Sequence, residues 1–248
     1  MLSYLFSFVS FSKEMIVINN TITAKIRMEE IDFARGIAII LMILFHLIVD
    51  LKDFFSYSLE YLQGFWYIEG KCSAILFIFL CGISSTLSHS STRHGIKIFI
   101  WAMILTAVTY IYNPDFYIRF GILHLLGISL LSATVISHLS RMWLLLLSGT
   151  AIIIGIYFSQ GFTSFPYLFP LGLQTNTFAS LDYYPIFPWY GIFVTGVLVG
   201  KQLYTPKQPL VSIPLPKSIT WLGQHSLAIY LTHQPILLAL LYMLHRNR

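Results

Sequence analysis

Ionisable side chains occupy one stripe of the first long apolar segment, RMEEIDFARGIAIILMILFHLIVDLKD. Arg35 and His46 lie 11 residues apart. An α-helix would therefore put both on one face, with His46 about 16 Å further along. Asp32 lies one turn before Arg35, and Asp50 lies one turn after His46. A histidine beside a carboxylate has the parts of a general base, an arginine suits phosphate, and charges inside a membrane helix usually mark function.

Each residue of this stripe also has a structural interpretation. Arg35 could be an interfacial anchor whose guanidinium pairs with Asp32. His46 could be a hydrogen-bonded histidine inside a helix bundle, and Asp50 could be an ordinary interfacial carboxylate. Their common face favours a functional site over three separate structural explanations.

Two later segments hold polar side chains at a similar expected depth. His124 lies in FGILHLLGISLL, just over one turn from the outer end of its expected helix. Asp182 and Trp189 lie at the outer mouth of another helix, in DYYPIFPWYG. Trp189 has the alternative of belonging to an interfacial aromatic belt.

The last apolar segment, LGQHSLAIYLTHQPILL, places Tyr230 and His233 about one turn apart on one helix face. His233 could be a site residue or an interhelical hydrogen-bond partner, and Pro235 is expected to kink the helix just beyond it. Arg35, in the first apolar segment, would mark an opening on the inner side of the membrane. The residues expected to converge in the outer half of the membrane are His46, Asp50, His124, Asp182 and His233.

The composition indicates that a lipid bilayer is the solvent of most of the chain. Of its 248 residues, 56% are hydrophobic and 10% are charged, whereas a soluble domain carries about 25% charge. This excludes a soluble globular enzyme, a disordered chain and a disulfide-rich secreted module. The formal net charge of +5 comes without a basic cluster interleaved with exposed aromatics, so no nucleic-acid partner is expected.

Neither a disulfide nor a metal site is expected. Cys72 and Cys81 lie nine residues apart on one apolar segment, which on a helix is about 13 Å and too far for a bridge. The sequence has no CxxC or HExxH spacing, so no metal ion is expected.

Seven mostly apolar stretches of spanning length predict an all-α fold, a polytopic transmembrane helical bundle. Residues 27–245 are expected to form one membrane domain, and residues 1–26 a segment at the interface or outside the core. With the N-terminus inside, 10 of the 15 Lys and Arg residues fall inside and 5 outside. The expected topology is therefore N-in, C-out. The stretches run approximately over 33–51, 72–90, 95–112, 119–138, 142–159, 185–203 and 222–243.

Five motifs in order resemble those of a known family. They are IDFARGIAIILMILFHLIVDL, LFIFLCGISSTLS, FGILHLLGISLL, PIFPWYGIFVTGVLVG and LGQHSLAIYLTHQPIL. Together they resemble the small bacterial members of the heparan-alpha-glucosaminide N-acetyltransferase catalytic domain family, over about residues 27–240. The first motif is also similar to the opening helix of the wider transmembrane acyltransferases, in which an Arg-Gly pair precedes a histidine.

The resemblance implies a multi-pass acetyltransferase of the cell membrane, here a bacterial inner membrane. Such an enzyme moves an acetyl group from cytosolic acetyl-CoA to an amine or hydroxyl of a sugar or other cell-envelope acceptor on the outer side. By position, Arg35 with Asp32 and Gly36 would hold the acetyl-CoA. The residues implied for catalysis are His46, Asp50 and His124, and those implied for the acceptor are Asp182, Trp189, Tyr230 and His233.

Two other functions fit the same residues. Intramembrane aspartates and histidines also build proton relays, so a small proton-coupled transporter is the main alternative, although no inverted repeat relates the two halves. A structural membrane subunit would use the polar residues to join helices. The sequence leaves the acceptor, the oligomeric state and the choice between direct transfer and an acyl-histidine intermediate open.

Overall fold

The computed structural model describes residues 27–246 apart from residues 89, 206 and 212. The segment 1–26, expected to be interfacial or outside the core, lies outside the described residues. Helices dominate the described part, and no strand occurs within it beyond isolated bridges. The elements are α2 (Glu29–Asp53), α3 (Gly64–Leu87), α4 (Ser91–Tyr112), α5 (Ile122–Ile136), α6 (Arg141–Phe158), the 3-10 helix η1 (Pro166–Leu171), α7 (Ile186–Leu203), α8 (Lys217–Gln224) and α9 (Ser226–His245).

The prediction of an all-α polytopic membrane bundle is confirmed. Six helices, α2, α3, α4, α6, α7 and α9, are long and apolar enough to cross a membrane. The apolar α5 is shorter, with 15 residues, and corresponds to the remaining predicted span. Helices suit this role because they satisfy their backbone hydrogen bonds internally.

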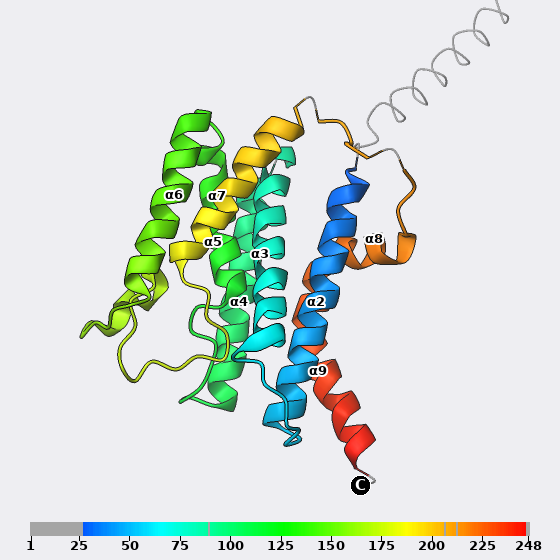
Figure 1. Ribbon diagram of the computed structural model, residues 1–248, viewed down its shortest axis with the longest axis vertical. Coiled ribbons are helices and arrows are strands. Elements are labelled where there is room, and N and C mark those ends of the chain that lie inside the picture. Colours follow the sequence, from blue (N-terminus) through cyan, green and yellow to red (C-terminus); the bar gives the residue numbers. More distant parts are fainter. Residues whose placement is uncertain (1–26, 89, 206, 212, 247–248) are drawn as a thin grey trace, which may run out of the picture.

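Two predicted spans have different bounds in the structure. The span predicted to begin at residue 72 begins at Gly64, because the polar residues Glu69 and Lys71 continue the helix instead of preceding it. The span predicted over 222–243 joins two elements. The chain turns at His225, so that the short α8 lies across α2 and α9 begins at Ser226 (Figure 1). Pro235 lies inside α9, which continues past it to His245.

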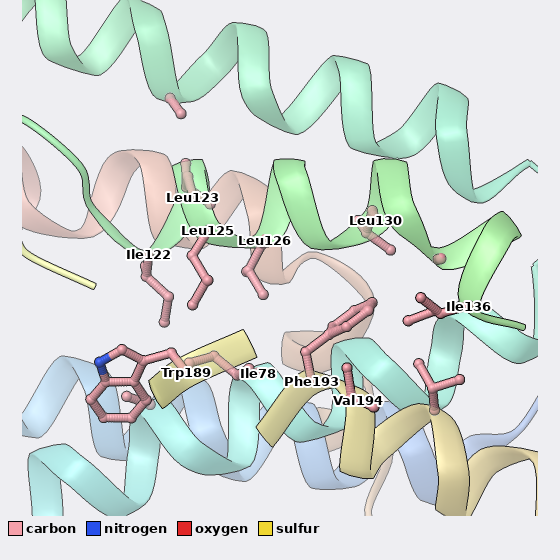
Figure 2. Packing of buried hydrophobic residues seen from close by; sticks show 14 of the residues in the cluster. Ile78, Ile122, Leu123, Leu125, Leu126, Leu130, Ile136, Trp189, Phe193 and Val194 are labelled. Carbon is pink, nitrogen blue, oxygen red and sulfur yellow. The ribbon is translucent and has the colours of Figure 1, made fainter. Parts of the chain in front are cut away.

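The core lies where α3, α5 and α7 meet (Figure 2). Leu125 and Leu126 of α5 point toward Phe193 and Val194 of α7, with Ile78 of α3 beside them. Glycines bring α3 and α7 close together: a methyl group at Gly82 would lie 2.2 Å from the Phe193 oxygen, and one at Gly196 would lie 2.2 Å from the Phe79 oxygen. Small residues at a helix crossing are a common route to tight packing in membranes.

The two ends of the bundle differ in charge. One end holds the start of α2, the connections α3–α4 and α5–α6, and the segment between α7 and α8 (Figure 1). We call it the basic end, after Arg27, Arg93, Lys97, Arg141, Lys201, Lys207 and Lys217. The opposite end holds the loops α2–α3, α4–α5 and α6–α7 and the end of α9, so the described chain begins and finishes at opposite ends (Figure 1).

Candidate functional site

Asp32 holds two guanidinium groups at the basic end. Its carboxylate is 3% exposed and accepts hydrogen bonds from Arg27 Nε at 2.5 Å and from Arg35 Nη1 at 2.9 Å. Arg35 also donates from Nη2 to the hydroxyl of Ser84 on α3. The pairing of Arg35 with Asp32 is thus present, and it fixes the planar guanidinium in one orientation. A fixed arginine fork is well suited to phosphate oxygens.

These two arginines open onto a large cavity. The cavity has a volume of about 910 Å³ and lies between α2, α3, α4, α5 and the start of α9. Its mouth is basic and polar, and its deeper wall is apolar, with Phe77, Leu123, Leu126 and Leu227. The polar lining residues include Arg27, Asp32, Arg35, Ser84, Ser88, Ser91, His94, Lys97, Lys207 and Tyr230.

Gly36, predicted to bind the cofactor, packs against α8 and is not among the residues that line the cavity. A methyl group at Gly36 would lie 2.0 Å from the backbone oxygen of Ile219. One at Gly223 would lie 1.7 Å from the backbone oxygen of Asp32. The two glycines therefore let α8 rest directly on the turn of α2 that carries Asp32.

A second polar group joins α2 to α9 further along the bundle. We call it the α2–α9 seam and define it by His46, Asp50, His233 and Gln234. Asp50 is fully buried and accepts a 2.5 Å hydrogen bond from Gln234 Nε2. The rings of His46 and His233 lie 4.8 Å apart between centroids. The structure thus brings three of the predicted residues together and supplies Gln234 as the partner of Asp50.

His124 is engaged on both ring nitrogens. Nδ1 accepts a hydrogen bond from the Gly121 backbone N–H at 3.2 Å, and Nε2 lies 3.2 Å from the hydroxyl of Thr106. That hydroxyl already donates to the Ile118 oxygen, so Nε2–H of His124 is the donor. Its ring is stacked on Phe120 and 3% exposed. These contacts fasten the start of α5.

Asp182 lies beside the same helix start, in the connection between α6 and α7. Its Oδ2 accepts the backbone N–H of Ile122 at 3.0 Å and faces the hydroxyl of Tyr230 at 3.4 Å. Burial raises the pKa of Asp182 to about 6, against the lowering effect of the Ile122 hydrogen bond, the Tyr230 hydrogen bond and the Lys71 charge. Trp189 is buried nearby, with the Lys71 ammonium 5.1 Å from its ring centroid.

Tyr230 connects the three groups. It lines the basic-end cavity, its hydroxyl faces Asp182, and its ring lies 5.6 Å from that of His233. The predicted residues therefore do not form one cluster. Asp32 and Arg35 lie at the basic end, while the seam and the start of α5 lie on either side of Tyr230.

Several polar residues were not singled out from the sequence. Gln234 follows His233 directly, and its position beside a histidine on an apolar helix was the available signal. Glu69 is 8% exposed, and neither of its carboxylate oxygens has a hydrogen-bond partner within the described part of the chain. Starting the second span at residue 72 left Glu69 outside it, so its burial could not be anticipated. The sequence pattern indicates Lys97 and Lys207 only as orientation signals, whereas the structure places both at the cavity mouth.

Within the described part of the chain, no three His, Cys, Asp or Glu side chains gather in a way that could hold a metal ion.

Fold and site together define a polytopic helical membrane protein with a basic cavity that reaches polar residues inside the bundle. The sequence model of the family described as heparan-alpha-glucosaminide N-acetyltransferase, catalytic, matches residues 27–235, and the chain belongs to this family. The resemblance drawn from the sequence motifs is confirmed. Comparison with curated proteins and with solved structures gave no significant match.

Proposed function

We propose that the protein transfers an acetyl group from acetyl-CoA, bound in the basic-end cavity, to an amine or hydroxyl of a sugar or other cell-envelope acceptor reached from the opposite end. Membership of an acetyltransferase family supports the reaction class. The observation that carries the donor assignment is the cavity of about 910 Å³ with two guanidinium groups oriented by Asp32. Its basic mouth matches the phosphates of CoA, and its apolar depth matches the pantetheine arm.

Charge supports the direction of transfer. Lys and Arg concentrate at the basic end, and an excess of these residues marks the cytoplasmic side. The cavity mouth would then open where acetyl-CoA is made available, in agreement with the N-in, C-out topology. The membrane would be the inner membrane of a bacterium.

The acetyl group would reach the region of Tyr230, between the seam and Asp182. An acceptor N–H or O–H attacks the thioester carbonyl, the new C–N or C–O bond forms, and the C–S bond breaks. His46 removes the proton from the nucleophile, and the CoA sulfur takes up a proton as it leaves. His46 is partly exposed, and a substrate atom would approach its ring from that side.

The remaining residues would shape the acceptor side. Both ring nitrogens of His124 are already hydrogen-bonded. We therefore assign it the role of holding the start of α5 and not that of transferring a proton. Asp182, which faces the Tyr230 hydroxyl, and the buried Trp189 would contact an acceptor that enters from the opposite end. Asp50 stabilises the seam through Gln234.

The donor site can be tested with the protein's own cysteines. Cys81 lines the cavity, whereas Cys72 is exposed outside it. In a Cys72→Ser variant, acetyl-CoA should slow the labelling of Cys81 by a thiol reagent, and pantetheine, which lacks the phosphates, should not. Equal labelling with and without acetyl-CoA would contradict donor binding in this cavity.

Transfer is tested by incubating the purified protein with labelled acetyl-CoA and a cell-envelope extract. We expect label in an envelope acceptor with the wild-type protein and none with His46→Ala at equal protein levels. Full activity in that variant would remove His46 from the reaction. If no molecule of the extract became labelled with the wild-type protein or the variant, the acetyltransferase assignment itself would be wrong.

A proton-coupled transporter is the second candidate. It is favoured by buried oxygens of Asp50 and Glu69 that have no hydrogen-bond partner among the described residues, since buried carboxylates serve proton relays in membranes. Uptake of a solute into proteoliposomes in the absence of any acyl donor would support it over acetyl transfer.

A further inference from the structure

His233 has one ring nitrogen committed and one free. Nδ1 lies 2.6 Å from the backbone oxygen of Tyr230. A carbonyl oxygen only accepts, so Nδ1 carries the hydrogen and Nε2 of the neutral ring carries a lone pair. Nε2 is buried and has no hydrogen-bond partner among the described residues. The ring is 9% exposed, so this lone pair is kept away from water.

Asp50 is occupied elsewhere. Its Oδ1 accepts the 2.5 Å hydrogen bond from Gln234, and its buried Oδ2 has no partner among the residues that the structure describes. No hydrogen bond joins Asp50 to His46 in the described part of the chain, although the two lie one turn apart on α2. The carboxylate therefore does not orient the histidine that precedes it.

The ring that His46 meets across the seam is that of His233. The centroids are 4.8 Å apart and the planes are tilted by 59°. Among the described residues no hydrogen bond joins the two rings, so the His46 ring must turn for one of its N–H groups to donate to Nε2 of His233. Of the side chains that the structure describes, the titratable ones whose rings meet that of His233 are His46 from α2 and Tyr230 from its own helix. Asp50 is held by the neighbouring Gln234.

We infer that His233 positions the ring of His46 during the acetyl transfer and accepts a hydrogen bond from it. The sequence suggested this role for Asp50. The inference rests on the proposed function. When one nitrogen of His46 takes the proton of the attacking amine or hydroxyl, the N–H on its other nitrogen donates to Nε2 of His233. The lone pair of Nε2 stabilises the imidazolium of His46 until His46 passes the proton to the leaving CoA sulfur. The proton taken from the attacking amine or hydroxyl therefore ends on the CoA thiol.

The tautomer of His233 gives a test that does not depend on activity. The full-length protein, labelled with ¹⁵N in its histidines and placed in lipid nanodiscs, is studied by NMR, and the His233 signals are identified by their loss in His233→Gln. We expect the neutral ring to carry hydrogen on Nδ1 and a lone pair on Nε2. Hydrogen on Nε2 would overturn the inference.

Activity is then measured with an isostere comparison. His233→Ala should lower transfer about 100-fold, the lower range for loss of proton-transfer assistance, with unchanged protection of Cys81 by acetyl-CoA. Added imidazole should restore transfer, whereas pyrrole, which has the same shape but no basic nitrogen, should not. His225→Ala is the matched control, because His225 also bonds a backbone oxygen through Nδ1, that of Trp221 at 2.9 Å, outside the seam.

Each result decides the inference. Wild-type transfer with full activity in His233→Ala would overturn it and leave the proposed function intact. Equal restoration by imidazole and pyrrole, or restoration by neither, would make His233 a packing residue only. A wild-type protein that transfers no acetyl group, with Cys81 unprotected by acetyl-CoA, would remove the proposed function and this inference with it.

Discussion

Gln234 donates a 2.5 Å hydrogen bond to the fully buried carboxylate of Asp50, and this contact joins α9 to α2. Among the described helices α9 packs mainly on α2, so this bond lies at the main contact of α9 with the bundle. A buried carboxylate left without a partner is far more costly than one that keeps its hydrogen bond. The Asp50–Gln234 hydrogen bond therefore helps to hold the neighbouring His233 in place, whatever chemistry the seam performs.

Gln234→Leu should destabilise the protein by about 1–3 kcal/mol, because Asp50 loses its donor while remaining buried. The double variant Asp50→Leu with Gln234→Leu should recover part of that loss, since both polar groups are then removed together. Thermal or denaturant unfolding in detergent measures both effects. Thr232→Val is the control, because its exposed hydroxyl bonds only the preceding turn of its own helix. Additive losses in the double variant would show that the two side chains do not interact.

Arg35→Gln should weaken acetyl-CoA binding about 10- to 100-fold, which corresponds to the loss of about 1.5–3 kcal/mol from charge-assisted hydrogen bonds. Arg35→Lys should restore little of this, because an ammonium cannot bridge Asp32 and Ser84 as the guanidinium fork does. Protection of Cys81 as a function of acetyl-CoA concentration gives the affinity. Lys217→Gln removes the same charge from α8 at the basic end, outside the cavity lining, and should bind normally. If acetyl-CoA binding were weakened equally in the Arg35→Gln and Lys217→Gln variants, Arg35 would contribute only through its charge.

The sequence was sufficient for the fold class because bilayer-length apolar runs leave helices as the available solution. The Asp32–Arg35 pair, given from the sequence as the structural alternative for Arg35, is present, since both residues lie on one helix at a fixed spacing. The sequence could not predict that Asp50 would pair with Gln234, because that contact spans 184 positions and depends on how α9 packs on α2. The role of Gly36 at α8 was hidden for the same reason. Periodicity reveals which residues share a face, but the element that packs against that face is set by tertiary structure.

Gly223→Ala should destabilise the protein by about 1–3 kcal/mol and weaken acetyl-CoA binding. The added methyl group would lie 1.7 Å from the Asp32 backbone oxygen, so α8 must move away from the turn of α2 that orients both arginines. Gly149→Ala is the matched control in another helix, since no atom lies within 4 Å of the added methyl there. That control should be neutral or slightly stabilising, because alanine favours helix more than glycine does. Comparable effects at the two glycines would mean that the α2–α8 contact is dispensable.

Acid should stabilise the protein through Asp182. Burial raises the pKa of this carboxyl from its ordinary value of 3.8 to about 6 in the folded protein. Between these two pH values the folded state binds more protons than the unfolded state, so stability falls as pH rises from about 4 to about 6. Asp182→Asn should flatten this part of the profile, measured as the unfolding midpoint in detergent across that range. Asp115→Asn is the control, because Asp115 is an exposed loop carboxylate. A slope that persists unchanged in Asp182→Asn would assign the pH dependence to another buried group and leave Asp182 ionised beside Ile122 and Tyr230.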